Sequence, residues 1–233
     1  MRFLLTLIKD IRYQMNYGFY LLYAFISALY IALLFILPVE YKRMAASVLI
    51  LSDPSMLGVF FSGGIWLLEK SEGLLSMWRI TPLLPIEYIL SKALSLSLIS
   101  TLSAVLIALF AFQGNCDYVL LTAGVFTGSA VFTLIGLLVA TYSRSVNQYM
   151  LLATLPAVLL TAPALLSAFG ISYPVFDLFP GTALWRLIAF SLQPGDRSPA
   201  WQWVCLALWL GTVLLLANKR VPAAMLSEGG ERR

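Results

Sequence analysis

Long apolar stretches alternate with short polar segments along the whole chain, and their lengths are those of membrane helices. About 20 apolar residues in a helix cross the hydrocarbon core of a bilayer. The pattern predicts six spans, at residues 18–38, 46–68, 93–112, 118–142, 148–170 and 201–217. We therefore expect an all-α integral membrane protein in which residues 1–233 form a single transmembrane domain.

Residues 1–17 precede the first span and have the pattern of an amphipathic helix. One face carries Leu4, Leu7, Ile8, Ile11 and Met15, and the opposite face carries Arg2, Thr6, Lys9, Asp10 and Asn16. A helix of this kind lies in the membrane interface. The segment is either a simple anchor or an elbow that transmits force to the first span.

Residues 171–200 are aromatic and apolar but are interrupted by prolines and glycines, so no part of them is long enough to span a bilayer. We expect short re-entrant or outer helices here, one of them over residues 182–192. Trp185 and Arg186 are interpreted as interfacial anchors.

Composition and charge give the class and the orientation. Hydrophobic residues make up 61% of the chain and charged residues only 11%, against about a quarter charged in soluble domains. With the N-terminus inside, the inner segments hold eleven Lys and Arg residues and the outer segments hold four. Positive charge is enriched in cytoplasmic loops. We expect a multi-pass protein of the cell (plasma or inner) membrane, with both termini cytoplasmic and no nucleic-acid partner.

Several kinds of chemistry are excluded by absent residues. The chain has no histidine and only Cys116 and Cys205, so imidazole catalysis and Cys/His zinc sites are not expected. It holds no GxxxxGK[ST] loop, and the middles of the predicted spans are nearly free of charge. We expect no enzyme activity and no cofactor or metal bound by this chain. The two cysteines fall on the outer side, where a disulfide and two free thiols fit equally well.

Polar residues inside the spans have two interpretations, a structural role and a position on a substrate path. Asp53 in Ser52-Asp53-Pro54 is favoured as a helix cap, with a position on a substrate path as the alternative. Hydroxyls of the third span, among them Ser97 and Thr101, are interpreted first as helix-packing contacts and second as lining such a path. The spacing of Gly124 and Gly128 predicts close helix packing.

The one polar island between spans covers residues 69–92. Residues 73–80 have the pattern of a short amphipathic helix that Thr81-Pro82 would end. A stiff segment of this kind between two spans would move both as a unit. The plainer interpretation is an ordinary inner loop.

The island contains Leu-Glu-Lys-Ser-Glu-Gly at 68–73, Thr-Pro-Leu at 81–83 and Glu-Tyr-Ile-Leu-Ser-Lys at 87–92. In these motifs it resembles the cytoplasmic loop of type-2 ATP-binding-cassette exporter permeases, most of all the fluoroquinolone-export permeases. Residues 10–14, 17–20 and 52–54 are similar too, and the likeness extends over the six-span layout. It implies a coupling helix that docks on a separate ATPase subunit, which would hold the ATP and Mg, and a dimer of permeases, with two copies of this chain or one copy beside a sister permease. The implied coupling residues are Glu69, Lys70, Glu72, Gly73, Trp78, Arg79, Thr81, Pro82 and Lys92.

These observations together predict the membrane subunit of an exporter for amphipathic drug-like or lipid-like molecules. Two alternatives stay open. One is a non-transporting scaffold or assembly factor whose inner loop docks a cytoplasmic protein, and the other is a haem-exporter-like permease.

Overall fold

The computed structural model describes residues 2–75, 84–112, 116–193 and 200–228, and within these ranges it contains helices and no strand. The helices are α1 (Arg2–Asn16), α2 (Phe19–Ile36), α3 (Val39–Ser52), η1 (Asp53–Leu57), α4 (Gly58–Ser71), α6 (Pro85–Phe112), α7 (Tyr118–Ala140), α8 (Val146–Ala168), η2 (Pro174–Leu178), α9 (Pro180–Ser191) and α10 (Ala200–Glu228). Six helical stretches in these ranges are long and apolar enough to cross a membrane, with α3, η1 and α4 counted as one. The predicted all-α membrane architecture is confirmed.

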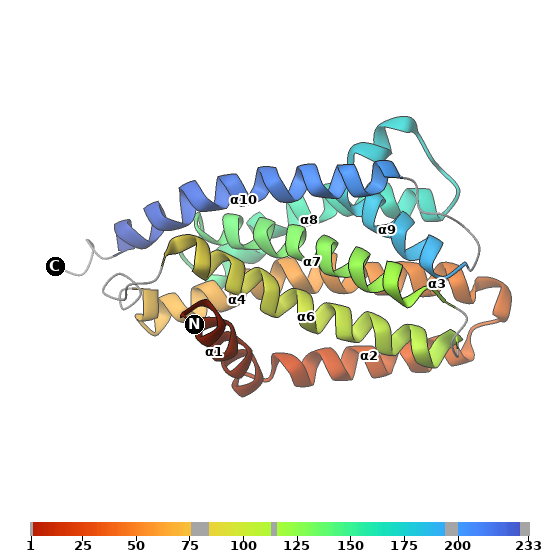
Figure 1. The fold of residues 1–233 in the computed structure, drawn as a ribbon, viewed down its shortest axis with the longest axis horizontal. Helices are drawn as coiled ribbons and strands as arrows, with labels where there is room; N and C mark the ends of the chain where they lie inside the picture. The colour runs from red at the N-terminus through yellow and green to blue at the C-terminus, as the bar shows by residue number, and fades with distance from the viewer. Residues whose placement is uncertain (1, 76–83, 113–115, 194–199, 229–233) are drawn as a thin grey trace.

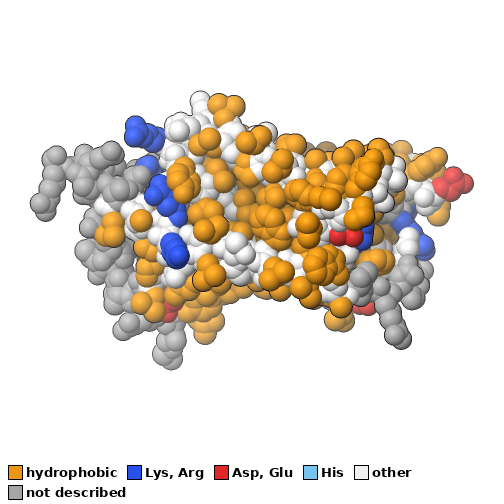
Figure 2. All heavy atoms as spheres, turned by 90° about the horizontal axis from the view of Figure 1, so that it is seen from above, with side chains coloured by type: hydrophobic (Ala, Val, Ile, Leu, Met, Phe, Trp, Pro, Cys, Tyr) orange, Lys and Arg blue, Asp and Glu red, His pale blue; other side chains and the backbone are white. Residues whose placement is uncertain are grey.

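The long helices run side by side along the molecule, and α1 lies across one end of the bundle (Figure 1). Helix α1 begins and α10 ends at this end, called here the α1 end, and α9 lies toward the opposite end, called the α9 end. On the face drawn in Figure 2, hydrophobic side chains cover much of the middle, and Lys and Arg gather toward the two ends. This distribution is that of a protein whose middle lies in lipid.

The second span is longer than its apolar pattern indicated. Its helix begins at Val39 instead of residue 46 and continues through Ser71, a stretch of 33 residues. Only Leu37 and Pro38 separate it from α2. Pro38 is the N-cap of α3, so the charged residues after it form the first helical turns and not an outer loop.

Asp53 and Pro54 lie inside this long helix, so the prediction that Asp53 caps a helix start is wrong. The helix widens into a π-turn over Asp53–Leu57, closed by a bond from the Gly58 N–H to the Asp53 carbonyl. Proline has no N–H to donate and its ring crowds the preceding turn. A π-bulge accommodates both defects without ending the helix.

Close contacts of α7 with its neighbours depend on glycines. A Cβ on Gly128 would lie 2.6 Å from Leu184 Cδ2, and one on Gly124 would lie 3.2 Å from Leu187 Cβ, both on α9. On the same helix, a Cβ on Gly136 would overlap the backbone of Val59. The predicted close packing is confirmed, and α7 is the central helix of the bundle.

The predicted outer segment forms η2 and α9. Helix α9 matches the predicted range 182–192 within two residues, and its buried face packs on α3, α7, α8 and α10. Trp185 donates from Nε1 to Ser47 Oγ at 3.0 Å, and Arg186 forms an ion pair with Asp177 at 2.6 Å. These two side chains therefore bind α9 to α3 and η2. Cys116 and Cys205 are both free thiols.

We expect Gly136→Ala to destabilise the protein by about 1–3 kcal/mol, because its methyl group has no space against α4. Gly64→Ala is the matched control, since nothing lies within 4 Å of a Cβ there, and it should be neutral or slightly stabilising. Thermal unfolding in detergent compares the two variants. Equal midpoints would contradict the packing described here.

Candidate functional site

Helix α1 turns its polar stripe toward the protein and its apolar face outward. Asp10 and Gln14 are 4% and 0% exposed, and Thr6 is buried beside them. Leu4, Leu5, Ile8 and Met15, by contrast, are each about 60% exposed. The predicted polar face is therefore divided: Thr6 and Asp10 point inward, while Lys9 and Asn16 are exposed. The helix uses hydrogen bonds to hold the bundle and presents leucines outward.

A buried ion cluster joins α1 to α4 and α6. The Lys92 ammonium lies 2.5 Å from Asp10 Oδ1 and also pairs with Glu69. All three side chains are 3–5% exposed. One cation thus bridges two carboxylates from two other helices, which is the arrangement that makes a buried charge tolerable.

Neutral side chains complete the hydrogen bonding of the cluster. Tyr88 donates to Glu69 Oε2 at 2.7 Å, and Ser91 donates to Asp10 Oδ2. The Lys92 ammonium also lies 5.2 Å from the centroid of the Tyr88 ring. Every carboxylate oxygen of Asp10 and Glu69 therefore has a donor, so the cluster is a fully paired network.

A second contact ties α1 to the end of α4. Tyr13 donates to Glu72 Oε2 at 3.0 Å, and Tyr17 donates to the other oxygen of this carboxylate. Burial, followed by the hydrogen bond to Glu72, raises the pKa of Tyr13; the pKa of Tyr17 is raised mainly by its bond to Glu72. Both phenols therefore keep their protons and act as donors. Gly73 follows with φ of 75°, a value that favours glycine and turns the chain away from α4.

The implied coupling residues fall into three groups. Glu69 and Lys92 are buried in the cluster, whereas Lys70 is half-buried and Glu72 is exposed beside the turn at Gly73. Trp78, Arg79, Thr81 and Pro82 lie outside the described residues. Buried side chains cannot contact a soluble partner directly, so Glu69 and Lys92 join α4 to α6 and do not form a docking surface.

The sequence reading did not identify Asp10, Gln14 and Tyr88 as partners of this site. The regular spacing of Thr6, Asp10 and Gln14, four residues apart, was the available signal. Three polar residues on one helical stripe can bond a neighbouring helix as readily as they can face water.

Beyond the cluster, a series of hydrogen bonds between side chains connects α6 to α1 and α2. Gln14 donates to Ser95 at 2.7 Å, Tyr23 contacts Ser100 at 3.0 Å, and Ser27 contacts Ser103 at 2.7 Å. Each interhelical bond of this kind contributes about 0.6 kcal/mol. These α6 hydroxyls therefore serve helix packing, in agreement with the first of the two interpretations.

The residues predicted for a substrate path are buried within the chain. Ser97 and Thr101 donate to carbonyls of their own helix. Asp53 is fully buried and accepts a hydrogen bond from Ser103. A path role for these three residues stays a prediction.

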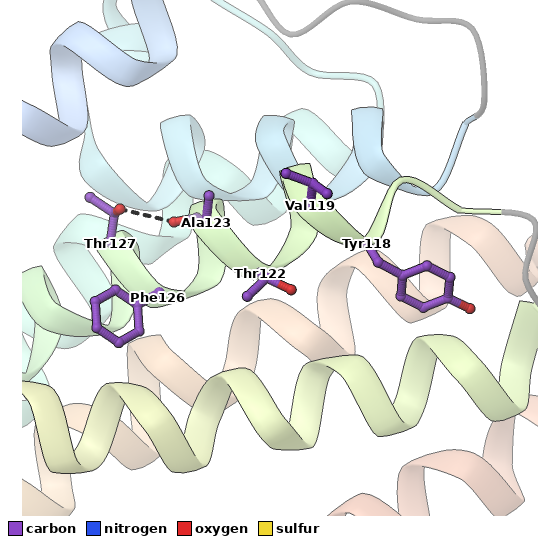
Figure 3. Close-up of a pocket in the computed structure, with 6 residues that line it drawn as sticks. All are labelled: Tyr118, Val119, Thr122, Ala123, Phe126 and Thr127. Carbon is purple, nitrogen blue, oxygen red and sulfur yellow. Dashed lines mark hydrogen bonds between the residues drawn. The ribbon is translucent and has the colours of Figure 1, made fainter.

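An open groove of about 610 Å³ lies on the half of α7 that is nearer the α9 end. Its walls are mainly apolar, with threonine hydroxyls between them, and Thr127 donates back to the Ala123 carbonyl (Figure 3). The lining residues are Tyr118, Val119, Thr122, Ala123, Phe126 and Thr127. No residue of this groove was singled out from the sequence.

Removing the central cation should destabilise the fold. We expect Lys92→Met to cost about 3–5 kcal/mol, because it leaves two carboxylates buried without a counter-ion. The triple variant Asp10→Asn, Glu69→Gln, Lys92→Met should recover most of this loss, since no charge then stays unpaired. Lys9→Met, at an exposed lysine of α1, is the control. If the single and triple variants unfold at the same temperature, the cluster is not energetically coupled.

Comparison with known proteins identifies the family of this chain. A family model described as the fluoroquinolones export permease protein family matches residues 1–225. Two fluoroquinolones export permease proteins of Mycobacterium tuberculosis, from strains CDC 1551 / Oshkosh and ATCC 25618 / H37Rv, are each 27% identical over 179 residues, which is 76% of this chain and 75% of theirs. The chain belongs to the fluoroquinolones export permease protein family.

Proposed function

We propose that this chain is the membrane subunit of an ATP-driven exporter, moving an amphipathic drug-like or lipid-like molecule out of the cell with energy from a separate ATPase subunit. The observation that carries the proposal is the buried cluster of Asp10, Glu69 and Lys92. Glu69 and Lys92 lie on the two helices that flank residues 72–84, and Asp10 lies on α1. Force applied to that segment would therefore reach α1, α4 and α6 through this one cluster.

We propose that a separate ATPase subunit supplies this force. The printed sequence contains no phosphate-binding GxxxxGK[ST] loop, and metal-ligating clusters are absent from the described ranges. A nucleotide-binding ATPase that contacts the polar island would supply the energy, with ATP and Mg bound in that partner. The excess of Lys and Arg at the α1 end favours a cytoplasmic location, and in that orientation a soluble ATPase would be able to reach the island.

The conformational step is a rigid-body movement. Closure of two ATPase subunits would displace the islands of two permeases, and α1, α4 and α6 would follow because their contacts are buried ion pairs and not exposed loops. A dimer is needed for a path between subunits, with a second copy of this chain or a sister permease as the partner.

The cargo class follows from the character of the α7 groove and from the relatives. Both relatives are named for export of fluoroquinolones, and the groove combines apolar walls with a few hydroxyls. Such a surface suits a planar amphipathic molecule better than a sugar or an inorganic ion.

The test measures ATP-dependent uptake of a fluoroquinolone into inverted vesicles that contain the chain with its co-purified, Walker-bearing ATPase. Glu72→Lys should lower both uptake and transport-linked ATPase activity roughly tenfold, since coupling energies correspond to about 5- to 150-fold effects, while insertion and folding are retained. Ser71→Ala is the control, because this exposed hydroxyl bonds only to its own helix. Unchanged ATPase stimulation in Glu72→Lys would refute the coupling assignment, and a scaffold would show no ATP-dependent uptake at all.

The groove gives a separate prediction for the cargo. Ala123→Trp fills the groove beside Thr127 without adding charge, so it should raise the KM for fluoroquinolone uptake several-fold. Basal ATPase activity of the complex should be unchanged. Ala223→Trp, at an exposed alanine of α10, controls for a bulky surface residue; equal uptake by the two variants would remove the groove from the path.

A further inference from the structure

A second polar site lies at the other end of the bundle, where the C-terminal ends of α2 and α6 meet the N-terminal turns of α3. A pocket of about 370 Å³ opens there. Its lining combines two basic side chains with aromatic and aliphatic ones, among them Phe35, Val39, Lys42, Arg43 and Phe110. The pocket lies at a helix end of three spans, which is the depth of the lipid headgroups.

Positive charge in this pocket is not neutralised by the described part of the protein. Within it, the side chains of Lys42 and Arg43 form no ion pair or hydrogen bond, and the Lys42 ammonium lies 5.3 Å from the centroid of the Phe35 ring. Glu40, in the same turn, pairs with neither. The N-terminus of α3 has no side-chain cap, so its helix dipole adds to the attraction for an anion. The pocket therefore favours a negatively charged group.

An unpartnered apolar stripe leads into the pocket along α6. Leu98, Leu102, Leu106 and Phe110 follow one another at four-residue spacing and are 39–55% exposed. Phe110 belongs both to this stripe and to the pocket lining. The cationic pocket suits an anionic headgroup, and the adjoining apolar stripe suits a hydrocarbon tail. The two surfaces together match the two parts of one amphipathic molecule.

We propose that this surface binds one anionic phospholipid, with its phosphate between Lys42 and Arg43 and an acyl chain along the α6 stripe. A free inorganic anion would leave the apolar stripe uncovered. A second copy of the chain fits poorly, because a two-fold contact here places Lys42 and Arg43 opposite themselves. The inference rests on the pocket, its charges and the stripe, and it is independent of the proposed transport function.

The test counts lipids that stay bound to the intact chain. The protein is placed in nanodiscs of phosphatidylcholine with a minor fraction of phosphatidylglycerol, and retained lipids are identified by native mass spectrometry. The wild type should retain phosphatidylglycerol in preference to phosphatidylcholine. Lys42→Ala with Arg43→Ala should lower this preference by roughly 30-fold, from the attraction of two basic residues to an anionic lipid.

Two matched variants separate this site from general electrostatics. Lys42→Arg with Arg43→Lys keeps both charges and should retain the preference. Lys9→Ala with Arg12→Ala removes two exposed charges at the α1 end, outside the pocket lining, and should lower the preference less than the double alanine variant in the pocket does. Circular dichroism in discs of pure phosphatidylcholine checks the fold. If the double alanine variant does not fold, Lys42→Gln and Arg43→Gln are tested singly, each with about a fivefold loss expected.

Three results would overturn the proposal. The first is unchanged phosphatidylglycerol retention in folded variants that lack these charges. The second is equal retention of both lipids by the wild type, which would show an apolar stripe without headgroup recognition. The third is an efficient disulfide between two copies of a Val39→Cys variant, which would identify another copy of the chain as the occupant.

Discussion

Burying one lysine among hydrophobic helices imposes the constraint on which the rest of this site depends. An ammonium ion in a low-dielectric interior is strongly unfavourable unless counter-charges and hydrogen bonds surround it. Lys92 obtains them from Asp10 and Glu69, which come from different helices. Removing Lys92 would leave both carboxylates without a counter-ion, so this one side chain fixes the positions of α1, α4 and α6 relative to one another at this end of the bundle.

Away from the cluster, the bundle is held by weaker and more numerous contacts. Hydroxyl pairs connect α6 to α1 and α2, and glycines let α7 approach α4 and α9 closely. In lipid there is no hydrophobic force between helices, so close packing and polar contacts of this kind must supply the association. Buried ion pairs hold the helices together at the α1 end, whereas close packing and hydroxyl contacts hold them together elsewhere. In the proposed function, movement of the α1 end would be passed on as the displacement of whole helices.

Much of the fold was predictable because membrane spans are encoded in long local patterns. Six spans, the separate N-terminal helix and the glycine contacts of α7 all follow from residue spacing. The start of the second span at Val39 was missed, because its first turns carry charged residues that an apolar window leaves out. The π-turn at Asp53 was missed for a different reason: Asp-Pro is a common helix start, and continuing the helix depends on packing partners that a linear reading does not contain.

The site shows the same division between local and long-range information. The loop motif drew attention to Glu69 and Lys92, but their burial and the pairing of Lys92 with Asp10 depend on tertiary contacts, the second between residues separated by 82 positions. A motif conserves the chemistry of a segment and not its exposure, so residues that seem to form a docking surface can instead be the support beneath it. In this chain Glu72 is exposed and accepts hydrogen bonds from Tyr13 and Tyr17, whereas Glu69 and Lys92 are buried behind it. In the proposed function, the exposed residues of the motif would contact the ATPase, and the buried residues would pass its force to the helices.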